Sequence, residues 1–190
     1  MAKGIFCLET EWDFSAHKLK DETAVQPMLD FMKNRNKMEY VYRRVATRGD
    51  LLFYLKQLKK STFSKYEIVY LSFHGDTQSI KLEGENKEKS LVTLSELSQI
   101  ANGAFKDKFV HFGSCRTFLG SGTVLENFKI ETGAKIVSGY TRSVDYTLSS
   151  LMDIAYFNEL NNISVKYNTV ENPLEKRFGG LKSELGFRLI

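Results

Sequence analysis

Short apolar runs alternate along the chain with segments in which apolar residues repeat at helical spacing. The apolar runs occupy residues 4–8, 40–45, 66–73, 109–112 and 135–140. Runs of this length that end at a turn residue are typical of buried strands in a parallel sheet. The segments with helical spacing are residues 25–32, 50–58, 95–100, 123–130 and 144–160. This alternation predicts an α/β fold: a three-layer α/β/α sandwich with a mostly parallel central sheet covered on both faces.

Two parts of the chain depart from this alternation. Short apolar pieces at residues 80–82 and 91–92 flank a polar stretch, and they predict a small hairpin. The tail, residues 171–190, predicts a helix, a break at Gly179 and Gly180, and a short closing segment. Helix ends are expected at Gly103 and Gly133, because glycine accommodates the left-handed conformation that ends many helices.

Composition and charge narrow the class of protein. The 190 residues are 42% hydrophobic and 26% charged, and this length suits one domain over residues 1–190. The net charge of +4 is mild, and no motif interleaves basic and aromatic residues as in nucleic-acid binding. The first apolar run is too short for a signal peptide or membrane span. Two cysteines, Cys7 and Cys115, form neither a metal spacing nor a disulfide framework. We therefore expect a cytoplasmic protein without metal or cofactor.

Two of the predicted strands end close to residues that can do chemistry. The run Tyr-Leu-Ser-Phe leads to His74, and the run Val-His-Phe-Gly-Ser leads to Cys115. Reactive groups in open parallel sheets gather at the carboxyl ends of the strands. If the two strands are neighbours, the thiol and the imidazole are about one strand spacing apart, roughly 5 Å. A cysteine beside a histidine is a nucleophile with its base.

The residues around the pair fit the same chemistry. Gly75 permits a sharp turn after His74, and the backbone N–H groups of Gly75 and Cys115 are candidate oxyanion donors. His111 lies four residues before Cys115 on an extended run, about 13 Å away, which is too far to activate the thiol. His17 is expected to be solvated in a polar loop, and Cys7 to be packed inside a strand. Either member of the pair alone is more often an inert buried residue.

The strings that contain the pair resemble those of the caspase-like cysteine peptidases, a clan that includes caspases, metacaspases, gingipains, separases and CHAT peptidases. The resemblance rests on Ser-Phe-His-Gly ending at Gly75 and Phe-Gly-Ser-Cys ending at Cys115, with the pair 41 positions apart. With the opening Lys-Gly-Ile-Phe-Cys-Leu-Glu, and Gly139-Tyr140 followed by Val144-Asp145, nearly the whole chain is similar to a small, uncharacterised bacterial family of CHAT-like proteins.

The resemblance implies a caspase-like sheet, His74 as general base, Cys115 as nucleophile, and oxyanion donors at Gly75 and Cys115. It also implies a protein or peptide substrate and, for small bacterial members, activation by a partner protein in a defence or cell-death system. Caspases carry Gln-Ala-Cys-x-Gly, whereas this chain carries Gly-Ser-Cys-Arg-Thr. The aspartate specificity of caspases is therefore not expected here.

The resemblance further implies that loops after the first and fifth strands line the pocket for the residue before the scissile bond. These loops carry Glu9, Glu11 and Asp13, and then Arg142 and Asp145. Buried carboxylates, Asp145 first, favour a Lys or Arg side chain, whereas Arg142 favours an acidic one. Alternatively, these charges pair with one another or with water at the rim.

Other functions are weighed against an endopeptidase. The main alternative is a non-catalytic caspase-like interaction or regulatory module that keeps the fold with an idle pair. Gly-Ser-Gly-Thr at residues 120–123 precedes a helix whose N-terminus suits an anion, but no lysine follows as in a P-loop. A cysteine phosphatase needs arginine six residues beyond its cysteine, where this chain has Ser121.

Overall fold

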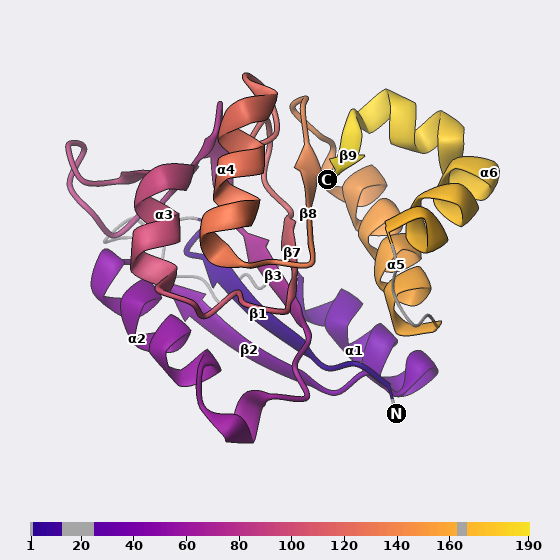
Figure 1. The fold of residues 1–190 in the computed structure, drawn as a ribbon, viewed down its shortest axis with the longest axis horizontal. Helices are drawn as coiled ribbons and strands as arrows, with labels where there is room; N and C mark the ends of the chain where they lie inside the picture. Colours follow the sequence, from indigo (N-terminus) through magenta and orange to yellow (C-terminus); the bar gives the residue numbers. More distant parts are fainter. Residues whose placement is uncertain (1, 13–24, 163–166) are drawn as a thin grey trace.

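The computed structural model describes residues 2–12, 25–162 and 167–190. Its centre is a six-stranded sheet in the order β2-β1-β3-β7-β8-β9 (Figure 1). The first five strands in this order are parallel, and β9 at the edge runs antiparallel to β8. The strands are β1 Ile5–Thr10, β2 Tyr40–Val45, β3 Ile68–Ser72, β7 Phe109–Phe112, β8 Ile136–Tyr140 and β9 Phe187–Leu189.

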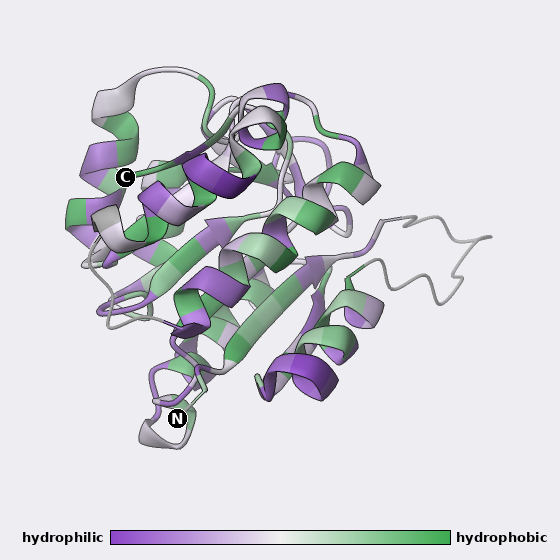
Figure 2. Ribbon diagram, turned by 90° about the vertical axis from the view of Figure 1, so that its right-hand side faces the viewer, coloured by the Kyte–Doolittle hydropathy of each residue, from purple (hydrophilic) through white to green (hydrophobic). Residues whose placement is uncertain are grey.

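Helices cover both faces of this sheet, as Figure 1 shows. One face carries α2 Arg48–Leu58, α3 Leu94–Ala101 and α4 Gly122–Thr132. The other face carries α1 Gln26–Asn36, α5 Tyr146–Asn162 and α6 Tyr167–Leu185. Because side chains alternate along a strand, neighbouring residues of β1 belong to different apolar cores: Phe6 lies in one and Cys7 in the other. The apolar strands lie between helices that turn their apolar sides inward (Figure 2). The predicted three-layer sandwich is confirmed.

The winding of the chain fixes where a site can form. From β1 the chain moves outward to β2, then returns to the other side of β1 to form β3, and continues to β7 and β8. The direction of winding therefore reverses between β1 and β3. In open α/β sheets, ligands bind at the carboxyl ends of the strands beside such a reversal.

Local sequence signals explain where several helices begin and end. Thr47 and Asp50 form a capping box at the start of α2, and Thr93 and Glu96 form one at the start of α3. Helix α4 ends at Gly133, whose φ of 68° lies in the left-handed region that glycine tolerates. A single 3-10 turn, Ser61–Phe63, follows α2. Among the described residues, no helix has the length and apolar content needed to cross a membrane.

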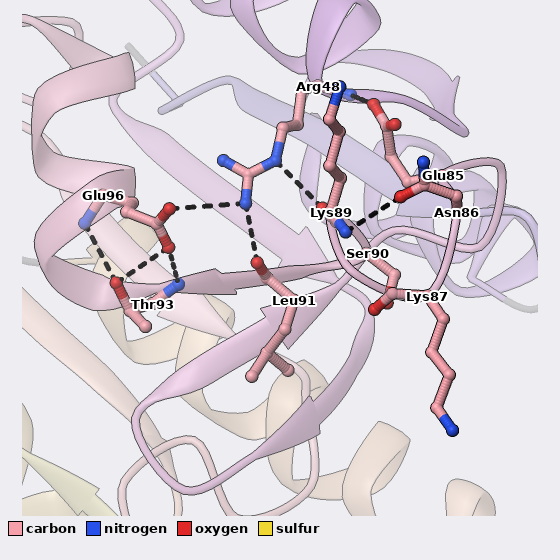
Figure 3. A network of polar contacts seen from close by, with 9 residues as sticks. All are labelled: Arg48, Glu85, Asn86, Lys87, Lys89, Ser90, Leu91, Thr93 and Glu96. Atoms are coloured by element: carbon pink, nitrogen blue, oxygen red, sulfur yellow. Dashed lines mark hydrogen bonds and ion pairs between the residues drawn. The ribbon is translucent and has the colours of Figure 1, made fainter.

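A second, smaller sheet begins at His74. It consists of β4 His74–Asp76, β5 Ser79–Lys81 and β6 Leu91–Thr93, all antiparallel. The hairpin of β5 and β6 was predicted, whereas β4 was not. Figure 3 shows how Arg48, at the start of α2, holds the connection between β5 and β6. The guanidinium of Arg48 donates to the carbonyl oxygens of Lys89 (2.9 Å) and Leu91 (2.7 Å). The backbone N–H of Arg48 donates to Glu85 Oε1 (2.8 Å).

Two expectations about the chain's elements need correction. Glu9 does not lie in a loop: it belongs to β1 and its side chain is fully buried. Helix α5 begins at Tyr146 rather than at Val144. The predicted break in the tail lies at Phe178, one residue before the expected Gly179, where a non-helical backbone joins two helical stretches within α6. His17 and Asp13 lie outside the described residues.

Candidate active site

His74 and Cys115 leave the main sheet at matched positions. In the parallel register of β3 and β7, Leu71 pairs with Phe112, and each reactive residue follows three positions later. Both side chains line one pocket of about 260 Å³ at the carboxyl edge of the sheet. The structure therefore brings together the two residues that the sequence singled out. The imidazole of His74 is exposed, and Cys115 is partly exposed.

Gly75 shows how closely the two segments approach. A Cβ atom added to Gly75 would overlap the carbonyl oxygen of Cys115 and lie 2.6 Å from Thr117 Oγ1 and 2.7 Å from Ser114 Cβ. Any side chain at residue 75 would push the start of β4 away from the turn that carries the cysteine. Glycine is thus required here for close backbone packing.

The turn at Cys115 is held by neighbouring backbone groups. Arg116 adopts a left-handed conformation, with φ 59°, and its N–H donates to the carbonyl oxygen of Arg142 (3.0 Å). The N–H of Val144 donates to Cys115 Sγ at 3.4 Å. The sulfur also lies 4.0 Å from the Val144 carbonyl oxygen, so the backbone of Val144 holds the Cys115 side chain in place at the pocket.

His74 is positioned by an aromatic neighbour. Its ring packs against that of Trp12 edge to face, with centroids 4.6 Å apart and an interplanar angle of 84°. The indole N–H of Trp12 donates to Glu9 Oε1 at 2.6 Å. The Glu9 carboxylate also accepts the Tyr42 hydroxyl (2.5 Å) and the Val25 N–H (3.2 Å). The buried Glu9 therefore fixes the tryptophan on which the histidine rests.

The charged residues proposed for the specificity pocket lie elsewhere. Asp145 accepts the N–H of Leu148 (3.0 Å) at the start of α5, and the Arg142 guanidinium donates to the carbonyl oxygen of Glu184 (3.0 Å). Glu11 forms an ion pair with Arg44. Besides His74 and Cys115, the described residues that line the pocket are Trp12, Phe73, Gly113, Val144, Tyr146 and Ser149.

A buried polar network lies behind this pocket, and sequence reasoning missed it. Asp153 of α5 accepts the hydroxyls of Tyr70 (2.6 Å) and Tyr140, and its Oδ1 lies 2.7 Å from His111 Nε2. The other ring nitrogen of His111 lies 2.9 Å from Ser138 Oγ. Both nitrogens of this fully buried histidine are thus occupied, so its role is structural.

The pocket-lining residues were also missed, although one carried a signal. Trp12 is the only tryptophan of the chain and stands two positions after the end of β1. A large aromatic residue at that position lies at the edge where the site was expected. Gly113, Val144 and Tyr146 come from two other segments, and only the fold brings them beside Trp12.

The two cysteines are distinguished by their surroundings. Cys7 lies inside β1 with no exposed surface, as expected. Burial raises the pKa of the Cys7 thiol well above its ordinary value, and the carboxylates of Glu9 and Asp153 raise it further. Only Cys115 is both accessible and beside a histidine. No group of three metal-ligating side chains occurs within the ranges that the structure covers.

Comparisons with known proteins give the family and support the fold. The chain belongs to a family of unknown function (DUF6642), whose model matches residues 2–190. No curated protein sequence matches it. A similar solved structure is the X-ray structure of a secreted C11 cysteine protease from Bacteroides thetaiotaomicron in complex with an irreversible peptide inhibitor. The TM-score is 0.58 at 8% identity, over 94% of this chain and 59% of that one. The likeness shows a caspase-like fold, and this chain spans less than two thirds of that protein's length.

Proposed function

We propose that this chain is a cysteine endopeptidase in which Cys115 is the nucleophile and His74 the general base. The observation that carries the proposal is the placement of both residues three positions beyond paired residues of adjacent strands, with both side chains lining one pocket. The caspase-like fold supports it, since a protease of this fold has been solved with a bound peptide inhibitor. Fold alone does not carry function, so the proposal rests on the site.

The reaction follows from the roles of the two side chains. His74 takes the thiol proton, and the sulfur of Cys115 attacks the carbonyl carbon of the scissile bond. The tetrahedral intermediate collapses, the C–N bond breaks, and the amine leaves with the proton from His74. Water then loses a proton to His74 and attacks the thioester, which releases the carboxylic acid and returns the proton to the sulfur.

Backbone N–H groups are the proposed oxyanion donors. Gly75 and Cys115 belong to the two segments in close contact, so their N–H groups lie on either side of the reacting carbonyl in this proposal. Across the described residues, no hydrogen bond uses the Cys115 N–H. That donor is therefore available for developing negative charge on a substrate oxygen.

The wider setting also belongs to the proposal. We place the chain among CHAT-like proteins as one domain over residues 1–190, acting in the cytoplasm on a protein or peptide. Activation by a partner protein in a bacterial defence system extends the same hypothesis. The sequence pointed to cleavage after a basic residue, but the expected carboxylate, Asp145, caps the start of α5 and does not line the pocket, so basic specificity is not part of this proposal.

A mixed peptide library tests the proposal. Wild type should cleave peptides, Cys115→Ala should abolish cleavage, and His74→Ala should slow it by about 100- to 10,000-fold, the usual contribution of a general base. Cys7→Ala is the matched control, because its thiol is buried inside β1 and does not line the pocket. Cleavage that survives Cys115→Ala would contradict the proposal. Absence of cleavage, with equal alkylation of Cys115 in wild type and His74→Ala, would favour the non-catalytic module.

A further inference from the structure

We propose that the pocket beside Cys115 binds an uncharged apolar side chain of the substrate, aromatic or large aliphatic, at the residue before the scissile bond. This inference rests on the proposed peptidase function and adds its substrate class. The walls are the rings of Trp12 and Tyr146 with Phe73 and Val144, and apart from the catalytic pair no described lining residue is charged at neutral pH.

The size of the pocket suits a ring. Its volume is about 260 Å³. An apolar cavity of about 150 Å³ in another protein is known to bind benzene, so a benzyl or isobutyl group fits here with space to spare. Tyr146 stands at the outer rim with 51% of its surface exposed, and a bound side chain would cover part of that surface.

Gly113 packs against a buried aromatic ring at the base of the pocket. A Cβ atom added to Gly113 would lie 2.6 Å from Cε2 and 2.8 Å from the hydroxyl oxygen of Tyr70. The Tyr70 ring therefore packs directly against residue 113 on the side away from solvent. Gly113 therefore contributes only backbone atoms to the pocket, and the residue behind it is an aromatic ring rather than a carboxylate.

Two buried carboxylates lie near the pocket, but neither is available to a cationic side chain. Glu9 accepts three hydrogen bonds, and Asp153 is bound by Tyr70, Tyr140 and His111. Both side chains are almost completely buried. A lysine or arginine in the pocket would lose water without gaining a direct partner, which disfavours it.

An acidic side chain is also disfavoured, because no described residue of the lining except His74 can carry a positive charge to pair with it. Burial raises the pKa of Tyr146, a hydrogen bond with Ser150 lowers it, and the carboxylates of Glu9 and Asp153 raise it further. The negative charge of these two carboxylates also opposes a substrate carboxylate placed beside Tyr146. The phenol stays neutral at physiological pH and offers an apolar ring to the substrate.

Peptidyl acyloxymethyl ketones that differ only at this residue test the inference. Phe, Leu, Lys, Asp and Ala versions are compared by their rates of covalent attachment to Cys115, measured by mass spectrometry of the full chain. Phe or Leu should react at least about 10-fold faster than Lys, Asp or Ala, because each methylene in an apolar pocket changes the specificity constant about 10-fold or more. Tyr146→Ala should reduce the Phe/Ala ratio by about 10-fold, whereas Leu151→Ala, an exposed site on the same helix, should leave it unchanged.

The outcomes separate the two proposals. Fastest labelling by the Lys or Asp compound, still dependent on His74, overturns the apolar pocket and leaves the peptidase standing. Labelling by no compound, while iodoacetamide modifies Cys115 in the same sample, removes the peptidase and the pocket assignment with it. Equal Phe/Ala ratios in wild type and Tyr146→Ala, with both variants folded by circular dichroism, also overturn the inference.

Discussion

Gly75→Ala tests the closest backbone contact in the site. The added methyl group would overlap the carbonyl oxygen of Cys115 and lie 2.6 Å from Thr117 Oγ1, where ordinary van der Waals contact begins at 3.4 Å. The φ angle of Gly75 is not positive, so an alanine at this position would adopt the same backbone conformation without strain. The whole effect of the substitution therefore comes from pushing β4 and the cysteine turn apart.

The expected loss follows from that displacement. Relieving the contact with Thr117 alone requires a shift of about 0.8 Å, and the overlap with the Cys115 carbonyl requires more. A misplacement of roughly 1 Å between reacting groups costs about 100-fold in rate. Overpacking in a tight contact also costs about 1–3 kcal/mol of stability. We therefore expect the specificity constant to fall about 100-fold in a chain that still folds.

The assay compares Gly75→Ala with Gly122→Ala, whose added Cβ meets no atom within 4 Å. The specificity constant for a cleaved peptide is measured for both variants, and urea unfolding reports their stabilities. Gly122→Ala should keep wild-type activity. If Gly75→Ala retains activity within about 2-fold of wild type, activity does not depend on close contact between β4 and the turn that carries Cys115. The reasoning from the position of His74 beside Cys115 would then be refuted.

Three further outcomes are expected. Iodoacetamide should modify Cys115 in the native protein and spare Cys7 until unfolding, since burial raises the Cys7 pKa; mass spectrometry of peptides checks this. Asp153→Ala should cost about 3–5 kcal/mol in urea unfolding, because it removes the buried carboxylate that Tyr70, Tyr140 and His111 share; a loss below about 1 kcal/mol would contradict this. Arg48→Ala should speed amide hydrogen exchange at residues 85–91, which it anchors.

The main sheet was predictable because four of its parallel strands, β1, β3, β7 and β8, are buried on both faces. Each of the five parallel strands appears in the sequence as a short apolar run, and two of the predicted runs, 40–45 and 109–112, match the observed limits. The small sheet was only partly predictable. Strand β4 is three residues long and polar, and it forms because β5 pairs with it, which no local pattern encodes.

Glu9 shows why a carboxylate misleads a pattern-based prediction. A charged residue normally marks the end of a buried strand, so the first strand was placed before it. In the fold, Tyr42 from the neighbouring strand and Val25 from a distant segment supply donors to this carboxylate. These partners are 33 and 16 residues away, so their contribution appears only in the tertiary structure.

The proposed catalytic pair, His74 and Cys115, differs from its pocket in how the sequence encodes it. His74 and Cys115 follow strands, and the register of those strands places them side by side, so the order of elements was enough to pair them. The pocket depends on which side chains are presented by four segments, those after β1, β3, β7 and β8. Those segments carry several charged residues that pair with neighbours or cap a helix, while the lining residues between them are apolar.

Trp12 links binding in the pocket to the position of the base. One ring forms a wall of the pocket and also packs against the imidazole of His74, 4.6 Å away between centroids. A substrate side chain that fills the pocket therefore contacts the residue that supports the general base. Under the proposed function, such a side chain stabilises the transition state by holding His74 in place as well as by binding. Removing it from the substrate should then lower kcat, whereas a pocket that only binds would raise KM.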